Sequence, residues 1–180
     1  MAAPTNDLVA RFPALAEYIR QRLPNVRGKL SVWKPFLKWS ELPESVAVHA
    51  VTYSAGRGPH VGITSRTGIN GIWLPSQPNF IWLHERVAKA FIDRRPGADV
   101  LVESTIMHEL VHWGNFVARH ALDGRKLVTR KDSSGRVRGG YTQSKGKLIE
   151  VGKRFEVDAY KVDVNLQNMG HVTTCGTCWS

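Results

Sequence analysis

The feature that most constrains this 180-residue chain is a long segment without proline, residues 99–122, which reads DVLVESTIMHELVHWGNFVARHAL. Its apolar residues recur at helical spacing, so we predict one helix over this range. His108 and His112 lie four residues apart near its middle and therefore project from the same helix face. A pair of imidazoles in this arrangement is typical of a metal site.

The pentapeptide HELVH at 108–112 narrows the chemistry of that site. Two histidines at this spacing can ligate one zinc ion at about 2.0–2.1 Å, and a catalytic zinc ion needs a third protein ligand and an open fourth position. Glu109 is turned away from ligation but can reach a water molecule, which predicts a general base. The metzincin pattern would require glycine at 115 and histidine at 118, and the sequence has Asn115 and Ala118.

The third ligand is therefore expected to be an acid on a later helix. The segment KRFEVDAYKVD offers Glu156, Asp158 and Asp163. Glu156 lies between two apolar residues, where a carboxylate is costly unless it meets a cation. Asp158 is about 200° further round the helix and cannot share that face. We predict one catalytic Zn²⁺ ion held by the two histidines and Glu156.

The pattern along the chain predicts an α+β fold, with strands early and two functional helices late. We expect helices over 14–23, 85–95 and 147–163, besides the central one, and strands over 45–54, 60–66, 71–75 and 80–85. Length predicts a single domain over residues 1–180. Within it, we interpret 123–147 as a basic loop or hairpin insertion, with DSSG at 132–135 as its tip, and 164–180 as an irregular tail.

Composition sets limits on location and partners. Hydrophobic residues make up 42% of the chain, yet no apolar stretch approaches the length of a membrane span. The N-terminal residues lack the pattern of a secretory signal peptide. We expect the chain to be cytoplasmic before export, and export to depend on something other than its own N-terminus.

The net charge of +10 is concentrated late in the chain. Residues 125–154 hold ten lysines and arginines against two acids. Such a segment either attracts phosphates and anionic surfaces or is a solvated loop, and the sequence leaves both interpretations open. Cys175 and Cys178 form a CxxC pair, which permits a disulfide, free thiols or half of a structural zinc site.

MHELVHWGN, followed after the basic segment by EVGKRFEVDAY, resembles the metallopeptidase effector domains carried by type VI secretion VgrG-type spike proteins. The resemblance implies a zincin-like metallopeptidase fold with a small twisted sheet, an HExxH active-site helix and a second ligand-bearing helix. It implies zinc ligation by His108, His112 and Glu156 and a catalytic role for Glu109. It further implies a toxin directed at a competitor or host cell, attached to a secretion spike, acting in the target-cell periplasm and neutralised by a cognate immunity protein.

The expected reaction is hydrolysis of a peptide bond in a protein or peptide substrate. The oxyanion that forms needs a donor besides the metal, and the candidates are Tyr160, His171 and Tyr141. We favour Tyr160 and His171 because both follow the third ligand. The strand FIWLH at 80–84 is a candidate cleft edge, able to pair with an extended substrate backbone.

Three other functions remain open at this stage. One is an SprT-like protease associated with DNA, which the basic segment and the CxxC pair favour, although the second CxxC pair of a zinc ribbon is missing. Another is a zinc amidase acting on cell-wall peptides. The third is a binding module whose metal site is purely structural, which would leave Glu109 without a role.

Overall fold

The computed structural model describes residues 3–52, 58–122, 130–131, 137–138, 141–144 and 147–172. The helices are α1 (Asn6–Arg11), α2 (Pro13–Gln21), α3 (Leu30–Ser40), α4 (Glu44–Val51), α5 (Glu85–Ile92), α6 (Ala98–Phe116) and α7 (Val151–Tyr160). Short 3-10 turns cover Leu23–Gly28 and Met169–His171, and a π-helical segment covers Val117–Leu122. The strands are β1 (Ala3–Pro4), β2 (His60–Thr64), β3 (Gly71–Trp73), β4 (Phe80–His84), β5 (Arg130–Lys131), β6 (Val137–Arg138), β7 (Tyr141–Ser144) and β8 (Lys147–Glu150).

The α+β prediction is confirmed. One small mixed sheet has the strand order β1-β2-β4-β3, in which β1, β2 and β4 run parallel and β3 pairs antiparallel with β4. Two further pairs, β5 with β6 and β7 with β8, form separate antiparallel ribbons. Among the described residues, no helix has both the length and the apolar character needed to cross a bilayer.

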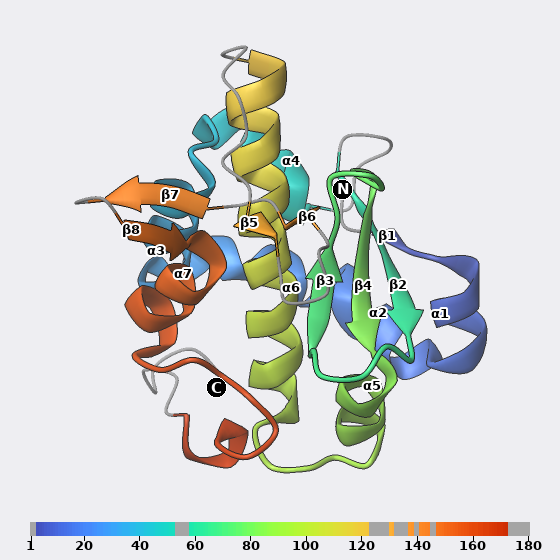
Figure 1. The fold of residues 1–180 in the computed structure, drawn as a ribbon. Helices are drawn as coiled ribbons and strands as arrows, with labels where there is room; N and C mark the ends of the chain where they lie inside the picture. The colour runs from blue at the N-terminus through green and yellow to red at the C-terminus, as the bar shows by residue number, and fades with distance from the viewer. Residues whose placement is uncertain are drawn as a thin grey trace.

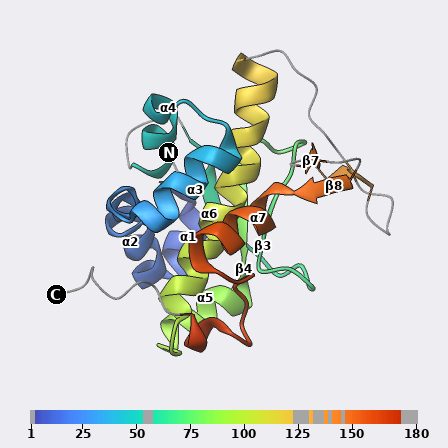
Figure 2. The same ribbon diagram turned by 90° about the vertical axis from the view of Figure 1, so that its left-hand side faces the viewer.

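Helix α6 is the centre of the molecule. Figure 1 shows it between the sheet on one side and α7 on the other, and Figure 2 shows α3 and α7 crossing it. Fifteen of its nineteen residues are buried, as expected for a helix that contacts other elements around its whole circumference. The predicted helix was correct in position, but after Phe116 the chain continues as the π-helical segment.

The start of α6 is fixed by Gly97, whose φ of 74° lies in the left-handed region. A side chain at this position would also collide with the chain near the C-terminal end, since a Cβ would lie 2.0 Å from the carbonyl oxygen of Met169. Gly97 therefore allows residues 169–170 to pack directly against the beginning of the central helix.

The strand predicted over 45–54 is wrong, because this segment begins with helix α4. Its valines suit a strand, but Ala47, Ala50 and Val51 recur at helical spacing and all three are buried. Burial of that face outweighs the β-propensity of individual residues. The predicted strands at 60–66, 71–75 and 80–85 are confirmed as β2, β3 and β4.

The proposed role of FIWLH as a cleft edge is also wrong. This segment is β4, which has β2 on one side and β3 on the other, so its backbone groups are already paired. The edge strands are β1 and β3, of which β3 packs against α6. The predicted hairpin tip at 132–135 and the CxxC pair lie outside the described residues.

Candidate metal centre

The two motif histidines meet at their Nε2 atoms. His108 and His112 lie one turn apart in the middle of α6, and their Nε2 atoms are 3.2 Å apart. Both side chains are largely buried, with 16% and 10% of their surface exposed. The helix therefore presents two ring nitrogens toward one point at the edge of the interior.

The third group at this point is Glu150, at the junction of β8 and α7. Its Oε1 atom lies 2.7 Å from Nε2 of His112 and 3.7 Å from Nε2 of His108. The same carboxylate caps α7 by accepting the backbone N–H groups of Gly152 at 2.8 Å and Lys153 at 2.7 Å. Its position is thus set by the start of the helix rather than by the metal-binding motif.

The three donor atoms suit a zinc ion. Tetrahedral ligands at about 2.0–2.1 Å from a common ion lie about 3.3 Å from one another. The separations of 2.7, 3.2 and 3.7 Å among the two nitrogens and the oxygen bracket that value. Two imidazoles and one carboxylate are also a donor set that zinc accepts at catalytic sites. The residues present therefore fit the metal.

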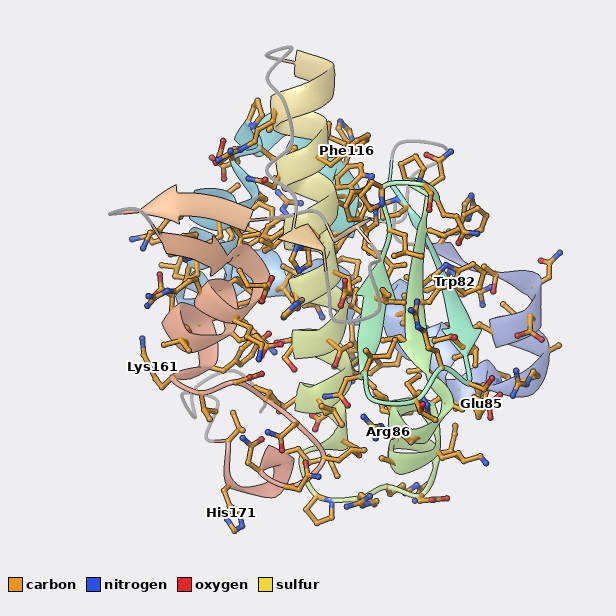
Figure 3. All side chains as sticks on the ribbon, viewed as in Figure 1. Trp82, Glu85, Arg86, Phe116, Lys161 and His171 are labelled. Carbon is orange, nitrogen blue, oxygen red and sulfur yellow. The ribbon has the colours of Figure 1, made fainter. Side chains whose placement is uncertain are left out.

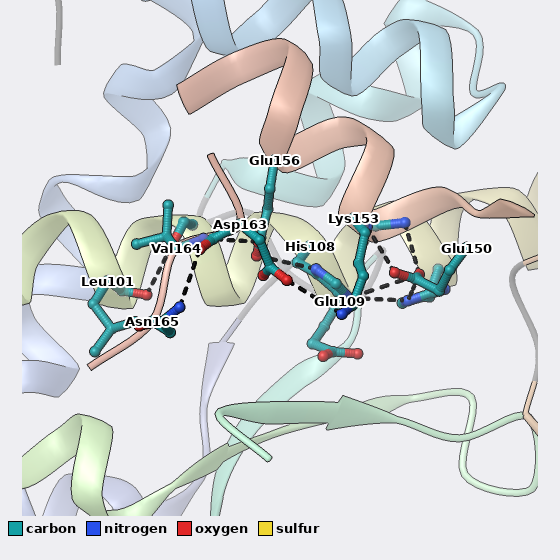
Figure 4. Close-up of polar contacts among 12 residues, drawn as sticks. Leu101, His108, Glu109, Glu150, Lys153, Glu156, Asp163, Val164 and Asn165 are labelled. Carbon is teal, nitrogen blue, oxygen red and sulfur yellow. Dashed lines mark hydrogen bonds and ion pairs between the residues drawn. The ribbon is translucent and has the colours of Figure 1, made fainter. Parts of the chain in front are cut away.

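Glu156 lies on the opposite side of the His108 ring (Figure 4). Its Oε1 atom is 3.0 Å from Nδ1 of His108, and its Oε2 atom accepts the backbone N–H of Val164 at 3.1 Å. The sequence led us to expect Glu156 among the metal ligands, whereas the carboxylate grouped with the two Nε2 atoms is that of Glu150. A carboxylate on the second ring nitrogen of a metal-binding histidine fixes the tautomer and orientation of the ring.

Glu109 faces the edge strand. Its Oε2 atom accepts the backbone N–H of Trp73 at 2.7 Å, and the residue is only 6% exposed. Strand β3 approaches α6 closely because residue 71 is glycine: a Cβ there would lie 2.6 Å from Cγ2 of Thr105 and 3.2 Å from Cγ of Glu109. The carboxylate beside the first histidine is therefore held at the boundary between the central helix and the sheet edge.

Gly152 forms a matching close contact on the other side. A Cβ at this position would lie 2.4 Å from both Cδ2 and Nε2 of His108. The first turn of α7 thus covers the imidazole, and only a residue without a side chain leaves the ring in place.

The carboxylates of Glu109, Glu150 and Glu156 surround His108 and favour a positive charge at this site. Burial works against a charged imidazole, but the hydrogen bond with Glu156 and the charges of Glu109 and Glu150 outweigh it and raise the pKa of His108 to about 10. Burial also works against the charge on Glu150, yet its contact with His112 lowers the pKa of that carboxyl to about 2. Burial raises the pKa of Glu156 to about 7. A divalent cation would supply the positive charge that this arrangement favours.

The two residues favoured for oxyanion binding lie elsewhere. The hydroxyl of Tyr160 donates to Oε1 of Glu103 at 3.2 Å, and the other oxygen of Glu103 is bound by Lys29 at 2.7 Å. His171 is exposed at the lower edge of the molecule and points to solvent (Figure 3). The side chain of Tyr141 is outside the described part of the chain.

The other two candidate acids, one on α7 and one just after it, have different partners. Asp158 accepts from Lys38 Nζ and Trp39 Nε1, both at 2.8 Å, and so joins α7 to α3. Asp163 pairs with Lys153 at 3.2 Å beside Glu156. Neither acid lies with the two Nε2 atoms.

Glu150 is the residue that sequence reasoning missed. Because the helix was predicted from residue 147, Glu150 was assigned to a helix interior rather than to its N-terminal cap. Glutamate is also not among the usual N-cap residues, so there was little reason in the sequence to place the start of the helix at Glu150. The one available sign was Gly152, two residues later, which marks a close approach of the backbone to a neighbour.

A helix that carries two histidines one turn apart and an acid beside the first, together with a carboxylate from another element, defines the metal-dependent hydrolase class of site. The chain belongs to the metallopeptidase toxin 3 family, whose family model matches residues 9–161 and so includes every residue of the centre. No curated protein and no solved structure matches the chain. The protein is thus a metallopeptidase toxin domain, a class of hydrolase that uses a divalent metal and acts on protein substrates.

Proposed function

We propose that this domain is a zinc-dependent peptidase in which His108, His112 and Glu150 hold one zinc ion. The observation that carries the proposal is the convergence of two Nε2 atoms and one carboxylate oxygen at spacings suited to that ion. Glu156 then acts through His108, by keeping its Nδ1 atom engaged so that Nε2 faces the metal. This assignment replaces Glu156 by Glu150 as the third ligand.

In the proposed reaction, Glu109 is the general base. A bound zinc ion supplies Lewis-acid polarisation of the scissile carbonyl and lowers the pKa of water toward 7. Glu109 takes the proton of the attacking water and passes it to the leaving amine. The N–H of Trp73 orients the Glu109 carboxylate. Within the described part of the chain, no strand pairs with the outer edge of β3, which leaves that edge for an extended substrate backbone.

The metal assignment is tested by elemental analysis after dialysis. Wild type is expected to hold one zinc ion per chain and Glu150→Ala to hold none. Glu156→Ala is expected to keep zinc with affinity lowered by about 10–100-fold, the usual effect of removing a partner of a metal-binding histidine. If Glu150→Ala is folded and retains zinc while Glu156→Ala loses it, then Glu156 is the third ligand.

The peptidase activity is tested with an unfolded protein substrate. Zinc-loaded wild type is expected to cleave it, and Glu109→Gln is expected to bind zinc equally well without cleaving. Equal cleavage by the two proteins would remove the general-base assignment.

We further propose that the toxin is delivered by a type VI secretion spike of the VgrG type and acts in the periplasm of a target cell, where a cognate immunity protein opposes it. The support is the family membership together with the resemblance of MHELVHWGN and EVGKRFEVDAY to spike-borne effectors. Expression in a bacterium with and without an added export signal tests the site of action. Growth arrest that needs both export and an intact Glu109 would support it, and arrest only without export would contradict it.

A further inference from the structure

A cavity of about 240 Å³ opens beside His108 and Glu109, the first proposed ligand and the proposed general base. His108, Glu109 and, one turn earlier, Thr105 line it from α6. Asn70 and Gly71 line the sheet side. Because the cavity shares its wall with the reacting groups, whatever occupies it lies next to the scissile bond.

The sheet side of this cavity is fixed in place. Arg86, on α5, donates to the carbonyl oxygen of Ile69 at 3.0 Å and to the side-chain oxygen of Asn70 at 3.3 Å. The backbone N–H of His84 also donates to the carbonyl oxygen of Asn70 at 2.8 Å. The loop that leads into β3, on the sheet side of the cavity, is therefore held by both α5 and β4.

The opposite side is formed by α7 and the chain that follows it, and it is acidic. Glu156 and Asp163 both line the cavity, and Glu109 adds a third carboxylate. Among the described lining residues, the basic ones are Lys153, whose Nζ atom is 3.2 Å from Asp163, and His108, which is already in contact with Glu156. This excess of negative charge is notable in a chain whose net charge is +10.

The ion pair at the mouth is readily opened. The side chains of Lys153 and Asp163 are 64% and 51% exposed, and exposed pairs of this kind are weak. A positively charged substrate side chain that enters the cavity can therefore replace Lys153 as the partner of Asp163. An acidic side chain would meet three carboxylates and one ammonium group that is already paired.

We propose that this cavity is a specificity subsite that selects a lysine or arginine side chain in the residue adjacent to the scissile bond. The inference rests on the proposed peptidase function and adds the substrate class. Asp163 is the main selecting residue, because half of its side chain is exposed and its cationic partner is the exposed Lys153, while its other contact is with the Glu156 carboxyl group. Lys153 competes with the substrate for the same carboxylate.

The test begins with a random peptide library digested by the zinc-loaded protein, with the cleavage sites read by mass spectrometry. Lysine and arginine are expected to be enriched at one position next to the cut. Two peptides that differ only in Lys or Gln at that position then give a ratio of kcat/KM values, expected to be at least about tenfold in favour of Lys for wild type.

Variants assign the preference to the cavity. Asp163→Asn is expected to reduce the Lys:Gln ratio by about fivefold, the effect of losing one partly exposed charge pair, and Lys153→Met is expected to raise it. Asp7→Asn is the matched control, since Asp7 is an aspartate of similar exposure (58%) on α1, and it should leave the ratio unchanged. The ratio, rather than the rate, separates selection from a general loss of structure.

The outcomes distinguish the subsite from the function on which it rests. Cleavage with no basic preference, or a preference that survives in Asp163→Asn, would overturn the subsite and leave the peptidase function standing. Failure of wild type to cleave any peptide or unfolded protein would overturn both.

Discussion

Replacing Gly152 by alanine tests how tightly the start of α7 constrains the metal centre. The added Cβ would lie 2.4 Å from Cδ2 and Nε2 of His108 and 2.7 Å from Cε1. Carbon atoms pack at about 3.5–4.0 Å, so the ring and the helix must separate by about 1 Å or more. Because Nε2 of His108 lies at the clash itself, relief of the overlap moves a proposed ligand atom.

Two effects on stability oppose each other in this variant. Alanine in place of a helical glycine favours the helix by up to about 1 kcal/mol. Overpacking of a filled site costs about 1–3 kcal/mol. The zinc-free protein is therefore expected to stay folded with a stability close to that of wild type, whereas zinc affinity is expected to fall by at least about 10–100-fold, or about 1.4–2.8 kcal/mol.

The measurement is a competition titration of zinc against a chromogenic chelator, with urea unfolding of the zinc-free proteins alongside. Gly28→Ala is the control, because nothing lies within 4 Å of a Cβ at that position. Zinc bound by folded Gly152→Ala with wild-type affinity would refute the reasoning, since the ring would then have another way to accommodate the methyl group.

Three further substitutions test contacts that do not involve the proposed metal ligands His108, His112 and Glu150. Gly71→Ala is expected to lower kcat by about tenfold or more, because its Cβ would push β3 away from Thr105 and move the N–H that orients Glu109, the proposed general base; unchanged turnover would contradict this. Lys29→Met is expected to destabilise the fold by about 3 kcal/mol in urea unfolding, since it leaves the buried Glu103 carboxylate with the Tyr160 hydroxyl but without a cation, and Glu103→Gln added to it should recover most of the loss. The hydrogen bond from Lys38 lowers the pKa of Asp158, so the stabilisation is present above the unfolded-state pKa and is lost as pH falls through the lower folded value. Asp158→Asn should therefore cost about 0.5–1 kcal/mol at pH 7, and its stability should converge on that of wild type near pH 2.

The central helix α6 and the strands β2, β3 and β4 could be predicted, because in each of them the local sequence pattern favours the same structure as the packing does. The segment around His108 is helical by spacing and is also buried as a helix. Helix α4 could not be predicted in the same way, since its valines favour a strand and only packing of one face decides otherwise. Helix α3 carries Pro35 in its interior, which argues against a helix on local grounds.

The site was predictable up to the point where it leaves the central helix. His108, Glu109 and His112 are set by spacing within one element. The choice between Glu150 and Glu156 depends instead on where α7 begins, and helix boundaries are weakly encoded in local sequence. The two acids are six positions apart, so one caps the helix while the other lies in its second turn, and the same imidazole contacts both from opposite sides.

Glu150 has two simultaneous tasks, as a helix cap and as a proposed metal ligand, and this couples the two thermodynamically. The N–H groups of Gly152 and Lys153 hold the carboxylate in place and so preorganise it for the ion. A bound ion would in turn keep the carboxylate in position to accept those hydrogen bonds. By linkage, the folded first turn of α7 strengthens zinc binding, and bound zinc stabilises that turn by the same free energy. Chelation should therefore increase amide hydrogen exchange at residues 152 and 153, far more than at the start of α5, whose cap is the imidazole of His84.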